Sequence, residues 1–148
     1  MFATPPRQKS RKIVSGIRSS DPKTRLGPPM PDFGRDGRLK RAEIETVADY
    51  VRSAAGLVTD PKADLAAGKA IFLQNCVACH GENGKGNRAL GVPDLTDAIW
   101  LYGSEKAAIV DSMWNGRAGM MPAWAGRLDE PTIKALAVYV HTLGGGEK

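Results

Sequence analysis

The pentapeptide Cys76-Val77-Ala78-Cys79-His80 constrains this chain more than any other feature. It reads C-x-x-C-H, the spacing typical of c-type haem attachment. Each thiol can form a thioether to one vinyl group of a haem, and the adjacent imidazole can take one axial position on the iron. Cys76 and Cys79 are the only two cysteines in the chain, so both serve one site. The motif therefore predicts one covalently bound haem c, with His80 as a ligand of the iron.

Three other uses of the motif are less well supported. A zinc site needs four nitrogen or sulfur ligands, and beyond the motif the chain offers only His141, without a second paired cluster. A thioredoxin-like thiol pair would begin a helix in a βαβ setting, whereas the segment before Cys76 has a helical pattern that ends at the motif. A disulfide between Cys76 and Cys79 would close a very small, strained loop.

The hydrophobic pattern of residues 61–148 predicts a compact all-α unit, because no stretch alternates strictly as a strand does. Helices are expected over about 64–75, 104–115 and 129–143, and a glycine-rich loop that can pass close to a flat cofactor is expected over 81–87. Ser104 is expected to cap the second of these helices, and Asp129, with Pro131 in the first turn, is expected to start the third. Gly68 and Phe72 are expected to let the first helix cross the last one closely.

An internal repeat divides the chain. Met30-Pro31-Asp32-Phe33 matches Met121-Pro122-Ala123-Trp124, and the apolar positions of a helix over about 41–55 match those of the last helix. Upstream, Gly16 and Arg18 resemble Gly116 and Arg117. Residues 1–60 are therefore predicted to be a partial, haem-less copy of the module in 61–148. Its N-terminal part is expected to be poorly ordered, and its helix to fray or to lean on the second domain.

Charge and hydropathy exclude several partners. The net charge of +5 lies in residues 1–60, which hold 12 Lys and Arg against 7 Asp and Glu, while residues 61–148 hold nine of each. The basic segment has no interleaved aromatic residues or known binding motif, so no nucleic-acid partner is expected. No apolar run approaches the length of about 18–20 residues that spans a bilayer, and the first residues lack the apolar region of a signal peptide.

The second axial position has three methionine candidates. Met113 lies on a predicted helix face and fits an ordinary core role. Met121 lies in a glycine-rich loop and precedes Pro122, which stiffens the backbone beside it. The residues alone rank Met121 only modestly above Met120.

A family resemblance covers most of the chain. The segments at 100–103, 115–124 and 137–141 resemble the C-terminal cytochrome domain of the dihaem subunit, subunit III, of cbb3-type cytochrome c oxidases. Residues 9–56 resemble the tail of the first cytochrome domain of the same subunit. The chain lacks the membrane anchor and the first C-x-x-C-H of that family.

The resemblance implies a class I cytochrome c fold over residues 61–148. It implies that Cys76 and Cys79 carry haem c, that His80 is the proximal ligand and that Met121 is the distal ligand. The Pro93 carbonyl is expected to accept the outer ring N–H of His80. The candidate haem contacts are Pro93, Trp100, Tyr102, Arg117 and Trp124.

The resemblance also implies the biological role. Members of the family sit at the periplasmic face of the bacterial inner membrane, with other c-type subunits, and pass electrons to a haem–copper catalytic subunit during aerobic or microaerobic respiration. The chain is then not an enzyme on its own and takes no small-molecule substrate. The alternative classes are a haem enzyme such as a peroxidase, which needs an open sixth site that Met121-Pro122 argues against, and a non-haem metal or thiol-redox protein.

Overall fold

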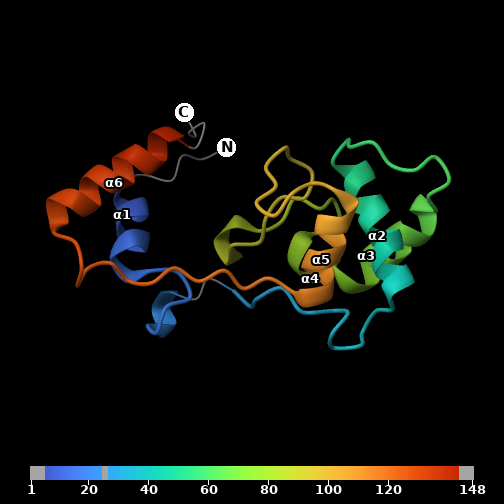
Figure 1. Cartoon of the computed structure of the whole chain (residues 1–148), viewed down its shortest axis with the longest axis horizontal. Coiled ribbons are helices and arrows are strands. Elements are labelled where there is room, and N and C mark those ends of the chain that lie inside the picture. Colours follow the sequence, from blue (N-terminus) through green and yellow to red (C-terminus); the bar gives the residue numbers. More distant parts are fainter. Residues whose placement is uncertain (1–5, 25–26, 144–148) are drawn as a thin grey trace. The chain divides into compact units, whose positions relative to one another are not determined.

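The computed structural model of the chain describes residues 6–24 and 27–143, which are mostly helical and contain no sheet (Figure 1). This confirms the predicted all-α class. No helix within the described ranges is long and apolar enough to cross a membrane. The elements in chain order are α1 Pro6–Ser15, the short 3₁₀ helix η1 Pro22–Thr24, α2 Arg41–Ala54, α3 Leu65–Asn75, α4 Val77–His80, the 3₁₀ helix η2 Arg88–Leu90, α5 Lys106–Asn115 and α6 Glu130–Leu143.

The chain divides into two compact units, and each is described by itself. One unit runs from Gly27 to Ala118, and the other joins Met1–Leu26 with Gly119–Lys148. This grouping does not follow the predicted boundary between residues 60 and 61, and that division of the chain stays a prediction.

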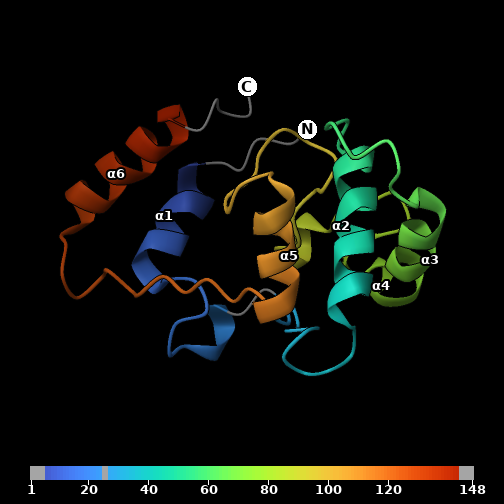
Figure 2. The same ribbon diagram turned by 45° about the vertical axis from the view of Figure 1, so that its right-hand side comes forward.

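In the unit of residues 27–118, α2 packs against both α3 and α5 (Figures 1 and 2). Ile44, Val47 and Ala48 of α2 are completely buried, and Phe72 of α3 lies in the same core. Because burial of such side chains is the main favourable term in folding, α2 is an integral part of this core. The prediction that its apolar face leans on a neighbouring domain agrees with this packing.

The close helix crossing at Gly68 involves α2 and not the last helix of the chain. A Cβ atom on Gly68 would lie 2.7 Å from both the Thr46 carbonyl oxygen and the Tyr50 Cβ. The prediction that Gly68 and Phe72 meet the last helix is therefore wrong for this fold. The physical reason is that α2 and α6 carry the same apolar pattern, so either helix offers a suitable face to α3.

A side-chain cap marks the start of α3, while α5 starts without one. Asp64 Oδ1 accepts a hydrogen bond from the Ala67 amide at 2.9 Å, which caps α3. At α5 the N-cap residue is Glu105, without a side-chain cap, so the predicted cap by Ser104 is wrong. The Ser104 carbonyl instead accepts a hydrogen bond from Arg52 of α2.

In the other unit, α1 lies along α6 (Figures 1 and 2). Asp129 Oδ1 accepts from the Thr132 amide at 2.9 Å, which confirms the predicted start of α6. Ile133 and Ala137 of α6 are buried. Helix α1 falls in the arm for which poor order was predicted. The glycines predicted to stop α6, at 144–146, lie outside the described residues.

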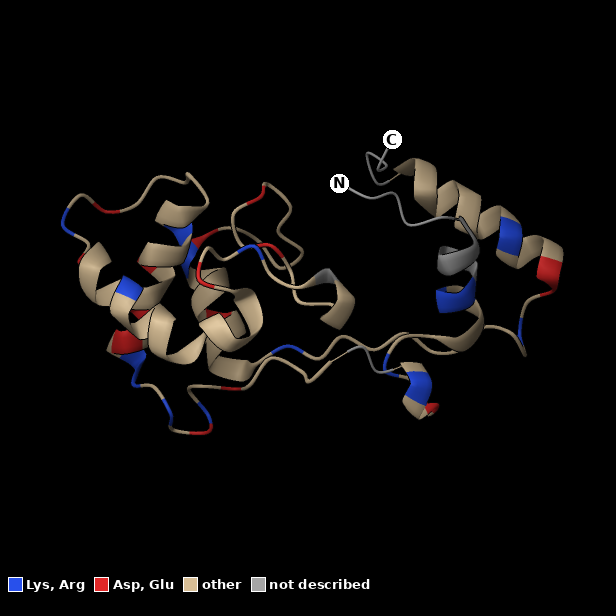
Figure 3. Cartoon of the chain, turned by 180° about the vertical axis from the view of Figure 1, so that it is seen from behind, with Lys and Arg blue, Asp and Glu red and all other residues tan. Residues whose placement is uncertain are grey.

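The positive charge of the chain belongs to the second of these units. Residues 27–118 hold 11 Lys and Arg and 12 Asp and Glu, a net charge of −1, and the remaining residues hold 10 and 4, a net charge of +6. Figure 3 shows residues of both signs in this unit, and both signs occur on α2 and on α5. Because its charges are mixed and nearly balanced, the unit that bears the C-x-x-C-H motif does not produce a strong electrostatic potential of one sign.

Candidate functional site

The C-x-x-C-H motif forms a helical turn at the end of α3. Cys76 ends α3, where its amide donates to the Phe72 carbonyl at 2.8 Å, and it is also the N-cap of α4. The amides of Cys79 and His80 both donate to the Cys76 carbonyl, at 3.2 and 2.9 Å. The buried side chain of Phe72 fixes α3 in the core. The two thiols and the imidazole therefore come from one short, anchored turn.

The imidazole of His80 is buried and oriented by one contact. Its Nδ1 lies 3.2 Å from the Pro93 carbonyl oxygen, as predicted from the sequence. A protonated Nδ1 donating to that oxygen leaves the Nε2 lone pair for a metal, which is the usual arrangement for ligating histidines. Burial lowers the pKa of His80, and the Pro93 contact opposes that shift. The neutral form that ligates iron is thus favoured.

The glycine-rich loop ties the motif to the segment around Pro93. The Gly86 amide donates to the His80 carbonyl at 2.8 Å, and the Leu95 amide donates to the Gly84 carbonyl at 2.7 Å. The predicted loop at 81–87 therefore holds the hydrogen-bond acceptor of His80 in place, with no strand beside it.

The two thiols are free and half-buried. Burial, and secondarily the neighbouring charge of Cys79, raises the pKa of Cys76 to about 11. Cys76 is therefore a neutral thiol at physiological pH in the haem-free chain. A pair of free thiols beside a neutral imidazole is the donor set that covalent haem attachment needs.

Four of the predicted haem contacts, Pro93, Trp100, Tyr102 and Arg117, lie in the same unit as the motif. The Arg117 guanidinium carbon lies 4.2 Å from the centre of the Tyr102 ring, a cation–π contact. Arg117 also pairs with the Asp111 carboxylate at 2.7 Å, which the sequence analysis missed because no helical spacing joins them. Trp100 Nε1 donates to the Asp97 carbonyl at 3.2 Å.

Trp124 lies in the other unit, where the Arg127 guanidinium carbon is 5.5 Å from its ring centre. The roles of Pro93, Trp100, Tyr102, Arg117 and Trp124 as haem contacts stay predictions.

The methionines occupy distinct environments. Met113 is buried in the core of residues 27–118, in agreement with its predicted structural role. Met120 is 73 % exposed. Met121 is half-buried in the other unit, where its backbone pairs with Ile17. Met30 is half-buried and packs against the core of the unit that carries the motif, a placement that the repeat alone did not reveal.

The residues of this unit fit a haem. The donors are present on one turn, and the loop that follows Pro93 leaves large apolar side chains exposed, with Leu101 at 88 %, Ile99 at 73 % and Tyr102 at 52 %. These three residues are close neighbours in the chain, and exposed apolar surface of this kind can bind another apolar group. The donor set and these uncovered side chains together suit a large, flat, apolar macrocycle.

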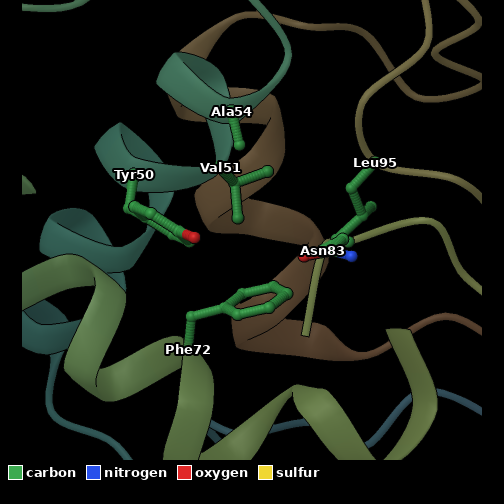
Figure 4. Close-up of a pocket in the computed structure, with 7 residues that line it drawn as sticks. Tyr50, Val51, Ala54, Phe72, Asn83 and Leu95 are labelled. Carbon is green, nitrogen blue, oxygen red and sulfur yellow. The ribbon is translucent and has the colours of Figure 1, made fainter. Parts of the chain in front are cut away.

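A separate hollow between α2, α3 and the glycine-rich loop is too small for such a group. Its volume is about 10 Å³, and Figure 4 shows Phe72 facing Val51, with Tyr50, Ala54, Asn83 and Leu95 around it. That volume holds about one water molecule. Gly84 completes its lining.

Comparison with known proteins gives a consistent result. The family described as cytochrome c oxidase, cbb3-type, subunit III matches residues 63–140. The cbb3-type cytochrome c oxidase subunit FixP of Bradyrhizobium sp. (strain ORS 278) is 60 % identical over 140 residues, which cover 95 % of this chain and 48 % of that relative.

The cbb3-type cytochrome c oxidase subunit CcoP of Azospirillum sp. (strain B510) is 50 % identical over 144 residues, 93 % of this chain and 48 % of the relative. The corresponding CcoP subunit of Cereibacter sphaeroides is 46 % identical over 136 residues, 91 % of this chain and 46 % of the relative. The chain thus spans about half the length of the curated relatives it matches.

Proposed function

This chain belongs to the family of cbb3-type cytochrome c oxidase subunit III, and on that premise we propose that it transfers electrons through one covalently bound haem c. The observation that carries the proposal is the turn from Cys76 to His80, with two free thiols and an imidazole whose Nδ1 faces the Pro93 carbonyl oxygen. The haem supplies the one-electron redox chemistry when it is bound. The protein supplies attachment, ligands and a shaped apolar surround.

Each residue of the turn has a role in this proposal. Cys76 and Cys79 form the thioethers, and His80 ligates the iron through Nε2. Pro93 acts through His80, because its carbonyl fixes the orientation of the ring. A methionine thioether opposite His80 favours a higher reduction potential than a second imidazole would.

The family resemblance gives this place to Met121, while Met30, the equivalent methionine in the first copy of the repeat, is expected to hold no haem. A filled sixth position suits electron transfer and leaves no open site for a peroxidase-type reaction.

The partners follow from the family. The relatives are subunits of cbb3-type oxidases, and we infer that the haem–copper catalytic subunit receives the electrons, alongside other c-type subunits at the periplasmic face of the inner membrane. In this role the chain is an electron-transfer subunit and does not itself reduce oxygen.

Covalent attachment is the test of this function. Produced in the periplasm with a c-type maturation system, the protein should show the mass of one added haem by intact mass spectrometry and one haem per chain by pyridine haemochrome. The Cys76→Ala, Cys79→Ala double variant is the matched control and should carry none. A haem that acid–acetone extraction removes from the wild-type protein would contradict the proposal.

A further inference from the structure

The glycine-rich loop folds back onto the carbonyl that the His80 ring faces. The Gly86 amide donates to the His80 carbonyl at 2.8 Å. A Cβ atom on Gly86 would lie 2.3 Å from the Pro93 carbonyl oxygen, and the φ angle of Gly86 is +69°. A residue with a side chain does not fit such an approach at a positive φ. Gly86 therefore lies directly against the carbonyl that orients the imidazole, and its own amide bonds to the backbone of His80.

A cluster of three polar side chains, Lys85, Asp94 and Thr96, flanks this contact. Asp94 Oδ1 accepts hydrogen bonds from the Thr96 amide at 2.7 Å and from the Thr96 hydroxyl at 2.6 Å. The same hydroxyl accepts a hydrogen bond from Lys85 Nζ, and Lys85 Nζ lies 3.6 Å from Asp94 Oδ2. Because Lys85 precedes Gly86 and Asp94 follows Pro93, the polar cluster joins the two segments that meet at the Pro93 carbonyl.

Asp94 carries most of the strength of the polar cluster. Its carboxylate accepts two charge-assisted hydrogen bonds, which are stronger than bonds between neutral groups. The hydrogen bond from the Thr96 hydroxyl lowers the pKa of Asp94, so the carboxylate stays charged at neutral pH. The Lys85 side chain is 67 % exposed, and an ion pair so exposed adds little stability by itself.

We propose that the polar cluster, with Asp94 at its centre, holds the Pro93 carbonyl against Nδ1 of His80. Asp94 acts through Pro93, so it is a positioning residue. A carbonyl held in place keeps the proton on Nδ1 and the lone pair on Nε2, and it raises the basicity of the imidazole as a ligand. The effect on the imidazole tautomer follows from the fold alone, whereas the effect on the iron rests on the proposed haem attachment.

Nitrogen-15 NMR of the full, haem-free chain tests the positioning of the ring. In the wild-type protein His80 should be the neutral tautomer that carries its proton on Nδ1. Asp94→Ala and Thr96→Val should each populate the tautomer with the proton on Nε2. They should also speed hydrogen exchange at the Gly86 amide about tenfold, the factor expected for loss of one hydrogen bond to a charged group. Thr96→Ser keeps the hydroxyl and should resemble the wild type.

Asp60→Ala is the matched control. Asp60 Oδ1 accepts from the Lys62 amide at 2.8 Å, with the same two-residue spacing as Asp94 and Thr96, in the segment before α3. Its loss removes a turn of the same kind away from the motif. The tautomer of His80 and the exchange rate at Gly86 should then stay as in the wild type.

The reduction potential of the matured protein tests the consequence for the iron. Asp94→Ala should raise the potential, because a weaker bond from Nδ1 makes the imidazole less basic and stabilises the ferric state less. Thr96→Ser and Asp60→Ala should keep the wild-type potential. A residue that only stabilised the loop would change the unfolding temperature and leave the potential as it is.

A populated Nε2–H tautomer in Asp94→Ala and Thr96→Val, with Asp60→Ala unchanged, supports the proposal, and Thr96→Val decides if Asp94→Ala fails to fold. An unchanged tautomer in either variant, an equal change in Asp60→Ala, a Thr96→Ser variant that behaves like Thr96→Val, or an unchanged potential in matured Asp94→Ala overturns it. A wild-type protein without covalent haem overturns the proposed function, while the tautomer in the haem-free chain still decides the role of the polar cluster.

Discussion

Truncation of Val51 to alanine should destabilise the protein far more than the same truncation of Val140. The two valines are equivalent in the repeat, but Val51 is 5 % exposed on α2 and Val140 is 52 % exposed on α6. At about 0.8 kcal/mol per buried CH₂, loss of two carbon atoms at Val51 removes about 1.6 kcal/mol of burial. Because Val51 already lines a small hollow, the change enlarges it, and the cavity term brings the expected loss to about 2–3 kcal/mol.

Val140→Ala should lower the free energy of unfolding by less than about 1 kcal/mol, because the Val140 side chain is half-exposed and its truncation removes little buried apolar area. Urea unfolding followed by circular dichroism measures both losses. Amide hydrogen exchange locates them, because Val51→Ala should speed exchange along α3 while Val140→Ala leaves α3 unchanged. Equal losses, or a larger loss for Val140→Ala with faster exchange in α3, would refute the packing of α2 on α3.

Three further outcomes follow from the unit of residues 27–118. Gly68→Ala should destabilise it by about 1–3 kcal/mol through overpacking against α2, although alanine is the better helix former; Ala66→Gly, at an exposed site on α3, measures the propensity term alone in the same urea titration. Asp49→Asn should lower the free energy of unfolding by about 1 kcal/mol. Lys106→Met should lower it more, because this variant leaves the buried Asp49 carboxylate without the partner that lies 2.6 Å away. Similar losses for the two variants in thermal unfolding would contradict this reasoning. In the haem-free chain, iodoacetamide should alkylate Cys76 about a hundredfold more slowly than an exposed cysteine below pH 9, and the rate should rise toward pH 11. Mass spectrometry of the alkylated peptide measures this rate, and a rate equal to that of an exposed cysteine would contradict the prediction.

The sequence predicted the local part of the site because neighbours in the chain determine it. The turn from Cys76 to His80 continues a helix that was predicted over about 64–75, and the proline at position 93 limits the backbone that presents a carbonyl to His80. The all-α class followed from helical periodicity for the same reason. The contacts that form the α3 cap and orient His80 join residues no more than 13 positions apart in the chain.

The choice of packing partner for α3 could not be predicted from the pattern. Ile44, Val47 and Val51 recur as Ile133, Leu136 and Val140, so two helices satisfy the same hydrophobic rule. Only the three-dimensional pairing distinguishes them. The ion pair between Arg117 and Asp111 was missed because six residues and a helix end separate the two side chains.

The pairing of α1 with α6 also sets an order of assembly during synthesis. Helix α1 ends at Ser15 and α6 ends at Leu143, so the ribosome makes the end of the second helix 128 residues after the end of the first. At about 5–20 residues per second, α1 waits roughly 6–26 s for its partner. Residues 27–118 are complete well before that time and can close their own core, with α2 reaching α3 before α6 exists. Because the chain is synthesised from its N-terminus, α2 can pack against α3 before α6 has been made.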